Sequence, residues 1–197
     1  RSSAASDVYK RQEQILSSAA LLVPIRTLVL DVLAPVLRAV GEQWEHGRMS
    51  VWQEHLISTL IRNTAGAMWR SNANGDPMLL ATPPFDLHEF GIALASLLAA
   101  SHGRRTLNLG PCVPVEEVVH ASKRLGPTTI VIGMTRQANP LESALEYAEL
   151  LAQQVPGTTE IWLGGTLGAQ VASQIKNRDV RAVATLEEFE RICGLPR

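Results

Sequence analysis

The chain has 197 residues, of which 46% are hydrophobic and 19% are charged, and its formal net charge at pH 7 is −1. This is the composition of a globular protein long enough to bury a sizeable core, as one domain or two small ones. The balanced charge gives no reason to expect that this chain binds nucleic acid or a membrane. No apolar run approaches the roughly eighteen residues of a membrane span, and the start has no apolar signal core, so we expect a cytoplasmic protein.

The first part of the sequence predicts helices. Residues 1–12 (RSSAASDVYKRQ) are polar and have no apolar period, so we interpret them as a cloning scar or the remnant of a linker. A short apolar stretch from Glu13 to Pro24 predicts a first helix. A second helix is expected from Ile25 to Trp44, where apolar residues recur at steps of three and four, and Pro35 should bend it.

A third helix is expected from Ser50 to Trp69, where Ser50 and Gln53 have the spacing of a capping box. Its predicted apolar face is formed by Trp52, Leu56 and Leu60. Because these helices have too much apolar surface to stand alone, residues 13–74 should form a small bundle. The following segment, SNANGDP, has the composition of a linker.

After the linker, short apolar strands alternate with helical patterns. The expected strands are Met78–Thr82, Arg105–Leu109, Thr129–Met134, Glu160–Leu163 and Val180–Ala184. The expected helices are Glu89–Ser101, Val115–Leu125, Leu141–Gln154, Leu167–Ile175 and Leu186–Ile192. This alternation predicts a flavodoxin-like (Rossmann-like) domain over residues 75–197. The fold class is therefore α + α/β, a helical bundle followed by a five-stranded parallel sheet.

The loop after the first strand carries a histidine. Asp86 lies two residues before His88, so its carboxylate can hydrogen-bond one ring nitrogen and leave the other free to bind a metal. Gly91 follows, where a side chain would obstruct a ligand or the backbone. In open α/β sheets such loops lie at the carboxyl ends of the strands, where ligands bind. For these residues alone, a loop histidine with a capping aspartate is an equally good interpretation.

Asp86-x-His88-x-x-Gly91 resembles the D-x-H-x-x-G signature of cobalamin-binding domains. The resemblance implies that His88 is the lower ligand of cobalt, in place of the cofactor's own benzimidazole, and that Asp86 supports it. Further cofactor-binding positions are implied by two later motifs of the family, S-x-L and a glycine pair. Gly164-Gly165 provides the pair, whereas the S-x-L position reads Gly133-Met134-Thr135 and lacks the serine hydroxyl that meets the buried benzimidazole.

A second constellation consists of Trp44 and the pair Glu54-His55. Taken singly, Trp44 reads as the last core residue of its helix, Glu54 as a complement to the positive end of the third helix, and His55 as solvent-facing. Together they resemble the W-x9-E-H pattern in the helical bundle of light-sensing cobalamin domains, which occur in MerR-type transcription regulators.

This second resemblance implies a photoreceptor that binds adenosylcobalamin. The bundle would cover the upper face of the corrin, Trp44 would lie against the adenosyl group, and Glu54 and His55 would line the same pocket. Light would break the cobalt–carbon bond, after which His55 would become the upper cobalt ligand opposite His88. The resulting movement of the bundle would carry the signal.

Partners and a second chromophore follow from the same resemblance. MerR-type regulators carry a helix-turn-helix domain before the bundle, and this sequence has none. We therefore expect a fragment, or a stand-alone sensor that acts as a homo-oligomer or through a signalling protein. The related photocobilins hold a bilin such as biliverdin beside the corrinoid. A bilin here would be non-covalent, because no cysteine lies near the bundle.

Two rival interpretations stay open. A corrinoid carrier of a methyltransferase system shares the plan of bundle and sheet, but its upper face must open to a partner's active site. A bulky tryptophan and a histidine suit a held adenosyl group better. A flavodoxin-like domain without a corrinoid would require both motifs and the glycine pair to be coincidental. We therefore expect a binding and sensing module without catalytic residues.

Overall fold

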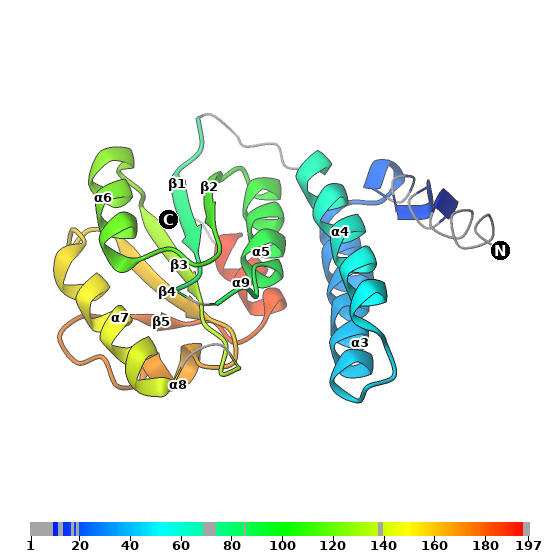
Figure 1. Cartoon of the computed structure of the whole chain (residues 1–197). Coiled ribbons are helices and arrows are strands. Elements are labelled where there is room, and N and C mark those ends of the chain that lie inside the picture. The colour runs from blue at the N-terminus through cyan, green and yellow to red at the C-terminus, as the bar shows by residue number, and fades with distance from the viewer. Residues whose placement is uncertain are drawn as a thin grey trace. The chain divides into compact units, whose positions relative to one another are not determined.

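The computed structural model describes residues 10–11, 14–16, 18, 20–68, 74–84, 86–137 and 140–194. The chain divides into two compact units, residues 1–69 and 70–197, and each is described by itself (Figure 1). The predicted fold class is confirmed, since helices are followed by a five-stranded parallel sheet. Most of the expected scar and part of the expected first helix lie outside the described residues. Among the helices described, none has the length and apolarity that crossing a membrane requires.

The second predicted helix changes type along its length. It consists of α2 (Ile25–Thr27), the π-helical segment η1 (Leu28–Leu33) and α3 (Ala34–Glu45). The π-helical segment ends at Leu33, two residues before Pro35, at which the sequence predicts a bend. Proline has no N–H to donate and its ring crowds the preceding turn, and a wider turn relieves that crowding.

Helix α4 (Val51–Met68) begins where the capping pattern predicted. The Gln53 side-chain oxygen accepts the backbone N–H of Ser50 at 3.0 Å and its hydroxyl at 2.7 Å. The predicted apolar face is right for Leu60 and wrong for Trp52, which is 64% exposed. The buried residues of α4 lie between positions 58 and 65. Trp52, in the first turn, lies outside this buried stretch.

The second unit is a doubly wound sheet with the strand order β2-β1-β3-β4-β5, all parallel. The strands are β1 (Pro77–Ala81), β2 (Arg105–Gly110), β3 (Thr129–Gly133), β4 (Glu160–Gly164) and β5 (Arg181–Ala182). The helices are α5 (Phe90–Ser101), α6 (Val115–Leu125), α7 (Leu141–Gln154), α8 (Gly168–Ala172) and α9 (Leu186–Cys193). The edge strand β5 and helix α8 are shorter than predicted.

Helices cover both faces of the sheet, with α5 and α9 on one side and α6, α7 and α8 on the other (Figure 1). Because side chains alternate along a strand, each strand contributes to both faces. Ile130 and Ile132 of β3 belong to the core cluster beneath α6, α7 and α8. Val131 and Gly133 therefore face α5, where the candidate site lies.

Candidate functional site

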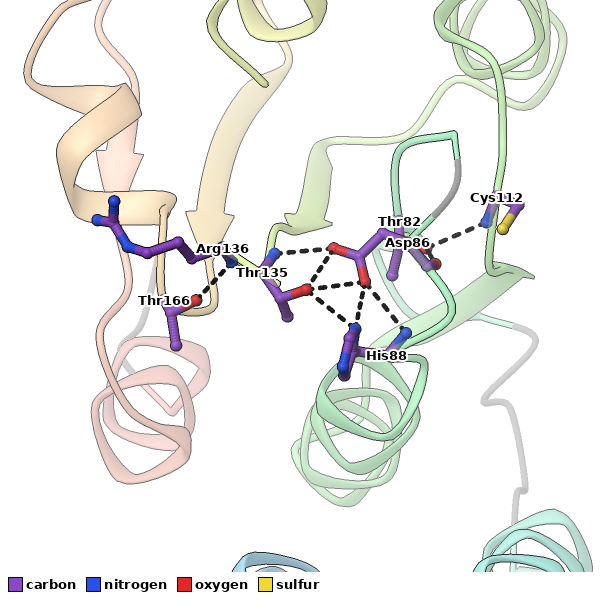
Figure 2. Close-up of polar contacts among 7 residues, drawn as sticks. All are labelled: Thr82, Asp86, His88, Cys112, Thr135, Arg136 and Thr166. Carbon is purple, nitrogen blue, oxygen red and sulfur yellow. Dashed lines mark hydrogen bonds and ion pairs between the residues drawn. The ribbon is translucent and has the colours of Figure 1, made fainter. Parts of the chain in front are cut away.

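The loops that follow β1 and β3 meet at the carboxyl edge of the sheet. Both strands are neighbours in the sheet, and the chain continues from them in opposite directions, so this is the topological switch point at which α/β sheets bind ligands. The first loop carries Asp86 and His88, and the second carries Thr135. Figure 2 shows these three side chains in contact.

Asp86 is the buried centre of this contact network, with no solvent exposure. Its Oδ1 accepts the backbone N–H of His88 at 3.1 Å, and its Oδ2 accepts the backbone N–H of Thr135 at 2.8 Å. The Thr135 hydroxyl lies 3.1 and 3.0 Å from the two carboxylate oxygens. A buried carboxylate requires such donors, because burial removes the water that would otherwise solvate its charge.

The network determines which nitrogen of His88 carries the proton. Nδ1 lies 2.9 Å from Asp86 Oδ1 and 2.9 Å from the Thr135 hydroxyl oxygen. If Nδ1 carried no proton, its lone pair would face the lone pairs of the carboxylate. A protonated Nδ1 donates to this pair of oxygens, and the Thr135 hydroxyl donates to Asp86. His88 and Thr135 then supply the carboxylate with four donors, two from each residue.

This tautomer leaves Nε2 of His88 with a free lone pair, which is the form in which imidazole binds a metal. The His88 side chain is 54% exposed. Within the described residues, no hydrogen bond to Nε2 is recorded. The site therefore presents one oriented imidazole nitrogen on a buried carboxylate support. The predicted relation between Asp86 and His88 is present, and Thr135 is its third member.

Thr82 braces the same loop from β1. Its hydroxyl donates to the backbone carbonyl of Asp86 and accepts the backbone N–H of Cys112 at 3.1 Å. A similar contact joins the next loops, where the backbone N–H of Arg136 donates to the Thr166 hydroxyl at 2.8 Å (Figure 2). The sequence prediction did not include Thr82, although a threonine at the end of the first strand is a residue that can hold a loop in this way.

A cavity of about 270 Å³ lies beside His88. Six of the predicted cofactor-binding residues line it, namely His88, Gly91, Gly133, Thr135, Gly164 and Gly165. A Cβ atom added at Gly91 would meet no protein atom within 4 Å, so this glycine leaves space open. One added at Gly133 would lie 3.0 Å from Ile92 Cγ2, so that side of the cavity is narrow.

The glycine pair has a structural role as well. Gly165 has φ of +81°, and a Cβ there would lie 2.3 Å from the backbone oxygen of Met134. Only glycine fits this turn without strain. By contrast, a Cβ at Gly164 would meet only the Val183 carbonyl oxygen, at 3.6 Å. The two glycines are therefore not equivalent, and Gly165 is required by the fold itself.

The apolar walls of the cavity were missed in the sequence. They include Ile92, Ala95, Val131, Val183, Leu186 and Phe189. Val131 lies on the same strand face as Gly133, and Ala95 lies one helical turn after Gly91. The position of these two residues in the wall could therefore have been predicted from the sequence. That of the residues from β5 onward could not, because their approach to α5 is a tertiary contact between distant parts of the sequence.

The predicted residues of the helical unit lie near the ends of two helices. Trp44 is in the last turn of α3 and is 52% exposed. The Glu54 carboxylate in the first turn of α4 accepts the Ser58 hydroxyl and lies 3.5 Å from His55 Nε2. The His55 side chain is 72% exposed. The structure thus pairs Glu54 with His55, and it records no hydrogen bond or ion pair between them and Trp44 among the described residues.

Comparisons with known sequences point to corrinoid proteins. Residues 10–67 match the family model described as the B12 binding domain. The HTH-type transcriptional repressor CarH of Myxococcus xanthus is 30% identical over 168 residues, which are 83% of this chain and 55% of that protein. The repressor CarA of the same organism is 26% identical over 160 residues, 80% of this chain and 53% of that protein. The chain thus corresponds to little more than half of either repressor.

Solved structures share the fold. The Methanosarcina barkeri monomethylamine corrinoid protein superposes with a TM-score of 0.67 at 14% identity, covering 92% of this chain and 88% of that one. The methanol:cobalamin methyltransferase complex MtaBC of the same organism gives 0.51 at 16% identity, covering 90% and 76%. These structures match the predicted arrangement of helices followed by a parallel sheet. The family model supports a B12-binding domain over residues 10–67, and the solved structures support the fold.

Proposed function

We propose that this chain is a cobalamin-binding sensor module in which His88 is the lower ligand of cobalt. The observation that supports the proposal is the network in which Asp86 and Thr135 hold His88 through Nδ1 and leave Nε2 available to a ligand. A single oriented nitrogen suits cobalt, whose in-plane positions are already filled by the corrin. Imidazole is a good ligand for such a metal, and its carboxylate partner increases its basicity.

The cavity beside His88 supports a place for the base of the cofactor's nucleotide tail. When His88 replaces the cofactor's own benzimidazole, that base and its nucleotide tail need another place. The cavity of about 270 Å³ is bordered by apolar side chains and by bare glycine backbone, which suits a flat aromatic ring. We therefore assign the tail to this cavity and the lower axial position to His88.

The experiment compares cobalamin binding by the parent chain, His88→Ala and Asp86→Ala. His88→Ala should retain cobalamin weakly and shift the corrin absorption bands. Asp86→Ala should weaken binding less, by about 10–100-fold, as is typical of residues that support a metal ligand. Binding and spectra that stay the same in His88→Ala would refute the assignment.

The proposal extends to light sensing with adenosylcobalamin, whose cobalt–carbon bond is light-sensitive. It rests on Trp44, Glu54 and His55 and on their resemblance to the light-sensing bundles. Trp44 offers a large exposed apolar face for the adenosyl group. His55 is proposed as the upper ligand in the illuminated state, and the contact with Glu54 orients its ring in the dark.

Illumination of the parent chain and of His55→Ala tests this part. Both should lose the adenosyl spectrum, and only the parent should settle into a stable spectrum with imidazole on both sides of the cobalt. Glu54→Gln keeps His55 and should reach the same final spectrum as the parent, because Glu54 is proposed to orient the ring only in the dark. Identical final spectra for His55→Ala and the parent would refute the role of His55. A spectrum that does not change in light would refute the light-sensing part and leave the corrinoid carrier of a methyltransferase system as the alternative.

The same samples test the proposed output and a second chromophore. The module is proposed to regulate transcription through a partner or through assembly of its own copies. Its molecular mass, measured by light scattering before and after illumination, should change if copies assemble. A bilin would add an absorption band of its own. Because its attachment is proposed to be non-covalent, denaturation should release the pigment from the protein.

A further inference from the structure

Three polar side chains line the cavity, those of His88, Thr135 and Thr185, and each has a hydrogen-bond partner within the protein. Nδ1 of His88 and the Thr135 hydroxyl are bound to Asp86. The Thr185 hydroxyl oxygen accepts the backbone N–H of Glu188 at 3.1 Å and caps α9. Every other described residue that lines the cavity is glycine, alanine, valine, isoleucine, leucine, methionine or phenylalanine.

The wall of the cavity formed by β3 carries no side-chain hydroxyl, because residue 133 is a glycine. Strand alternation places residues 131 and 133 of β3 on the side of α5, where they border the cavity. Val131 gives this wall two methyl groups, and Gly133 gives it no side chain. The middle of the sheet therefore offers no hydroxyl to a ring that enters between β3 and α5.

From this lining we propose that the cavity selects cobamides by the chemistry of their lower base, and that it prefers an apolar benzimidazole to a purine. The inference rests on the proposed function, since it assigns the nucleotide tail to this cavity. Adenine carries an amino group and ring nitrogens where dimethylbenzimidazole carries methyl groups. Buried against Ile92, Val131 and Phe189, most of these polar atoms would lose water without gaining side-chain partners, since the Thr185 O–H can satisfy only one of them.

The size of the preference follows from the penalty for an unsatisfied buried polar group. That penalty weakens binding by about ten- to hundredfold for one group. Benzimidazole has methyl groups at the same edge, and their contact with the apolar walls stabilises the complex. The two effects act in the same direction, so cobalamin should bind at least about tenfold more tightly than the adenine cobamide.

The test is a titration of the full chain with three corrinoids, followed by absorbance. They are cobalamin, the cobamide whose lower base is adenine, and cobinamide, which has no nucleotide base. We expect cobalamin to bind most tightly and the other two more weakly. Equal affinities for cobalamin and the adenine cobamide would overturn the selectivity and leave the proposed function intact. Equal affinities for cobalamin and cobinamide would show that the base does not enter the cavity. If none of the three binds, the proposed function fails as well.

Two variants of one wall residue test the cause. Val131→Thr keeps the shape of the side chain and adds a hydroxyl to the wall. It should lower the affinity for cobalamin and raise that for the adenine cobamide, so that their ratio falls several-fold. Val131→Ala is the control, because it keeps the wall apolar and should leave the ratio near that of the parent. A ratio unchanged in Val131→Thr, with the fold verified by circular dichroism, would refute the apolar wall as the cause.

Discussion

The hydroxyl of Thr135 provides a direct test of the network that orients His88. Thr135→Val removes the hydroxyl and keeps the shape of the side chain and the backbone N–H that donates to Asp86. The carboxylate then loses one donor, and Nδ1 of His88 loses one of its two partners. Because Asp86 has no solvent exposure, water cannot readily replace the lost group.

The expected magnitude is that of a hydrogen bond to a charged group, about 1.5–3 kcal/mol in the free energy of unfolding. With a urea dependence of about 1–3 kcal/mol per molar, the unfolding midpoint should fall on the order of 1 M. The assay is urea unfolding of the full chain without cofactor, followed by circular dichroism. Cobalamin affinity measured in parallel should also fall, because His88 is less well oriented.

Thr135→Ser is the matched control, because it keeps the hydroxyl and loses only a methyl group. It should recover most of the stability and most of the affinity. The reasoning is refuted if the valine variant is as stable as the parent, or if the serine variant is as unstable as the valine variant. Either result would mean that the hydroxyl does not contribute to holding Asp86.

Three further predictions concern single residues and the cofactor. Gly165→Ala should destabilise the protein by about 1–3 kcal/mol, because Gly165 has a positive φ and a Cβ there would meet the backbone of Met134. Gly91→Ala should leave stability nearly unchanged, and thermal melting checks both variants. Burial, and next the charge of Glu116, raises the pKa of Tyr147, so folding favours the protonated phenol. The resulting stability is complete below about pH 10 and is lost as the pH rises further, and urea titrations should find a smaller alkaline loss in Tyr147→Phe. Adenosylcobalamin at a hundred- to thousandfold excess over its dissociation constant should stabilise the fold by roughly 3–4 kcal/mol, and an unchanged melting temperature would contradict binding.

The elements of the sheet domain were predictable because proline and glycine mark their ends. Helix α6 has the predicted bounds, with Pro114 before its first residue and Gly126 in the left-handed conformation after its last. Helix α7 also has the predicted bounds and follows Pro140. These residues act through local backbone geometry, so a single sequence contains the information. The shortened β5 had no such signal, because the length of an edge strand depends on its pairing with β4.

The candidate site was predictable only in part. The contact between Asp86 and His88 could be predicted from their spacing, because both residues lie in one loop. The role of Thr135 depends on two loops from adjacent strands. The motif predicted its position, but its hydrogen bonds to Asp86 follow only from the way the two loops pack together. The exposure of Trp52 shows the same limit in the helical unit, since periodicity identifies a face but does not say how far a partner covers it.

If His88 is the lower ligand, a nitrogen of this protein binds cobalt in place of the cofactor's own base. Electron paramagnetic resonance of the reduced, paramagnetic cobalt(II) form tests it directly, because the lower axial nitrogen splits the spectrum. The protein is prepared with ordinary histidine and with 15N-labelled histidine, and both samples receive unlabelled cobalamin. We predict that labelling changes the axial nitrogen splitting from a triplet to a doublet, and that His88→Ala abolishes this change. A triplet that persists in the labelled protein would mean that the cofactor keeps its own base and that His88 is not the cobalt ligand.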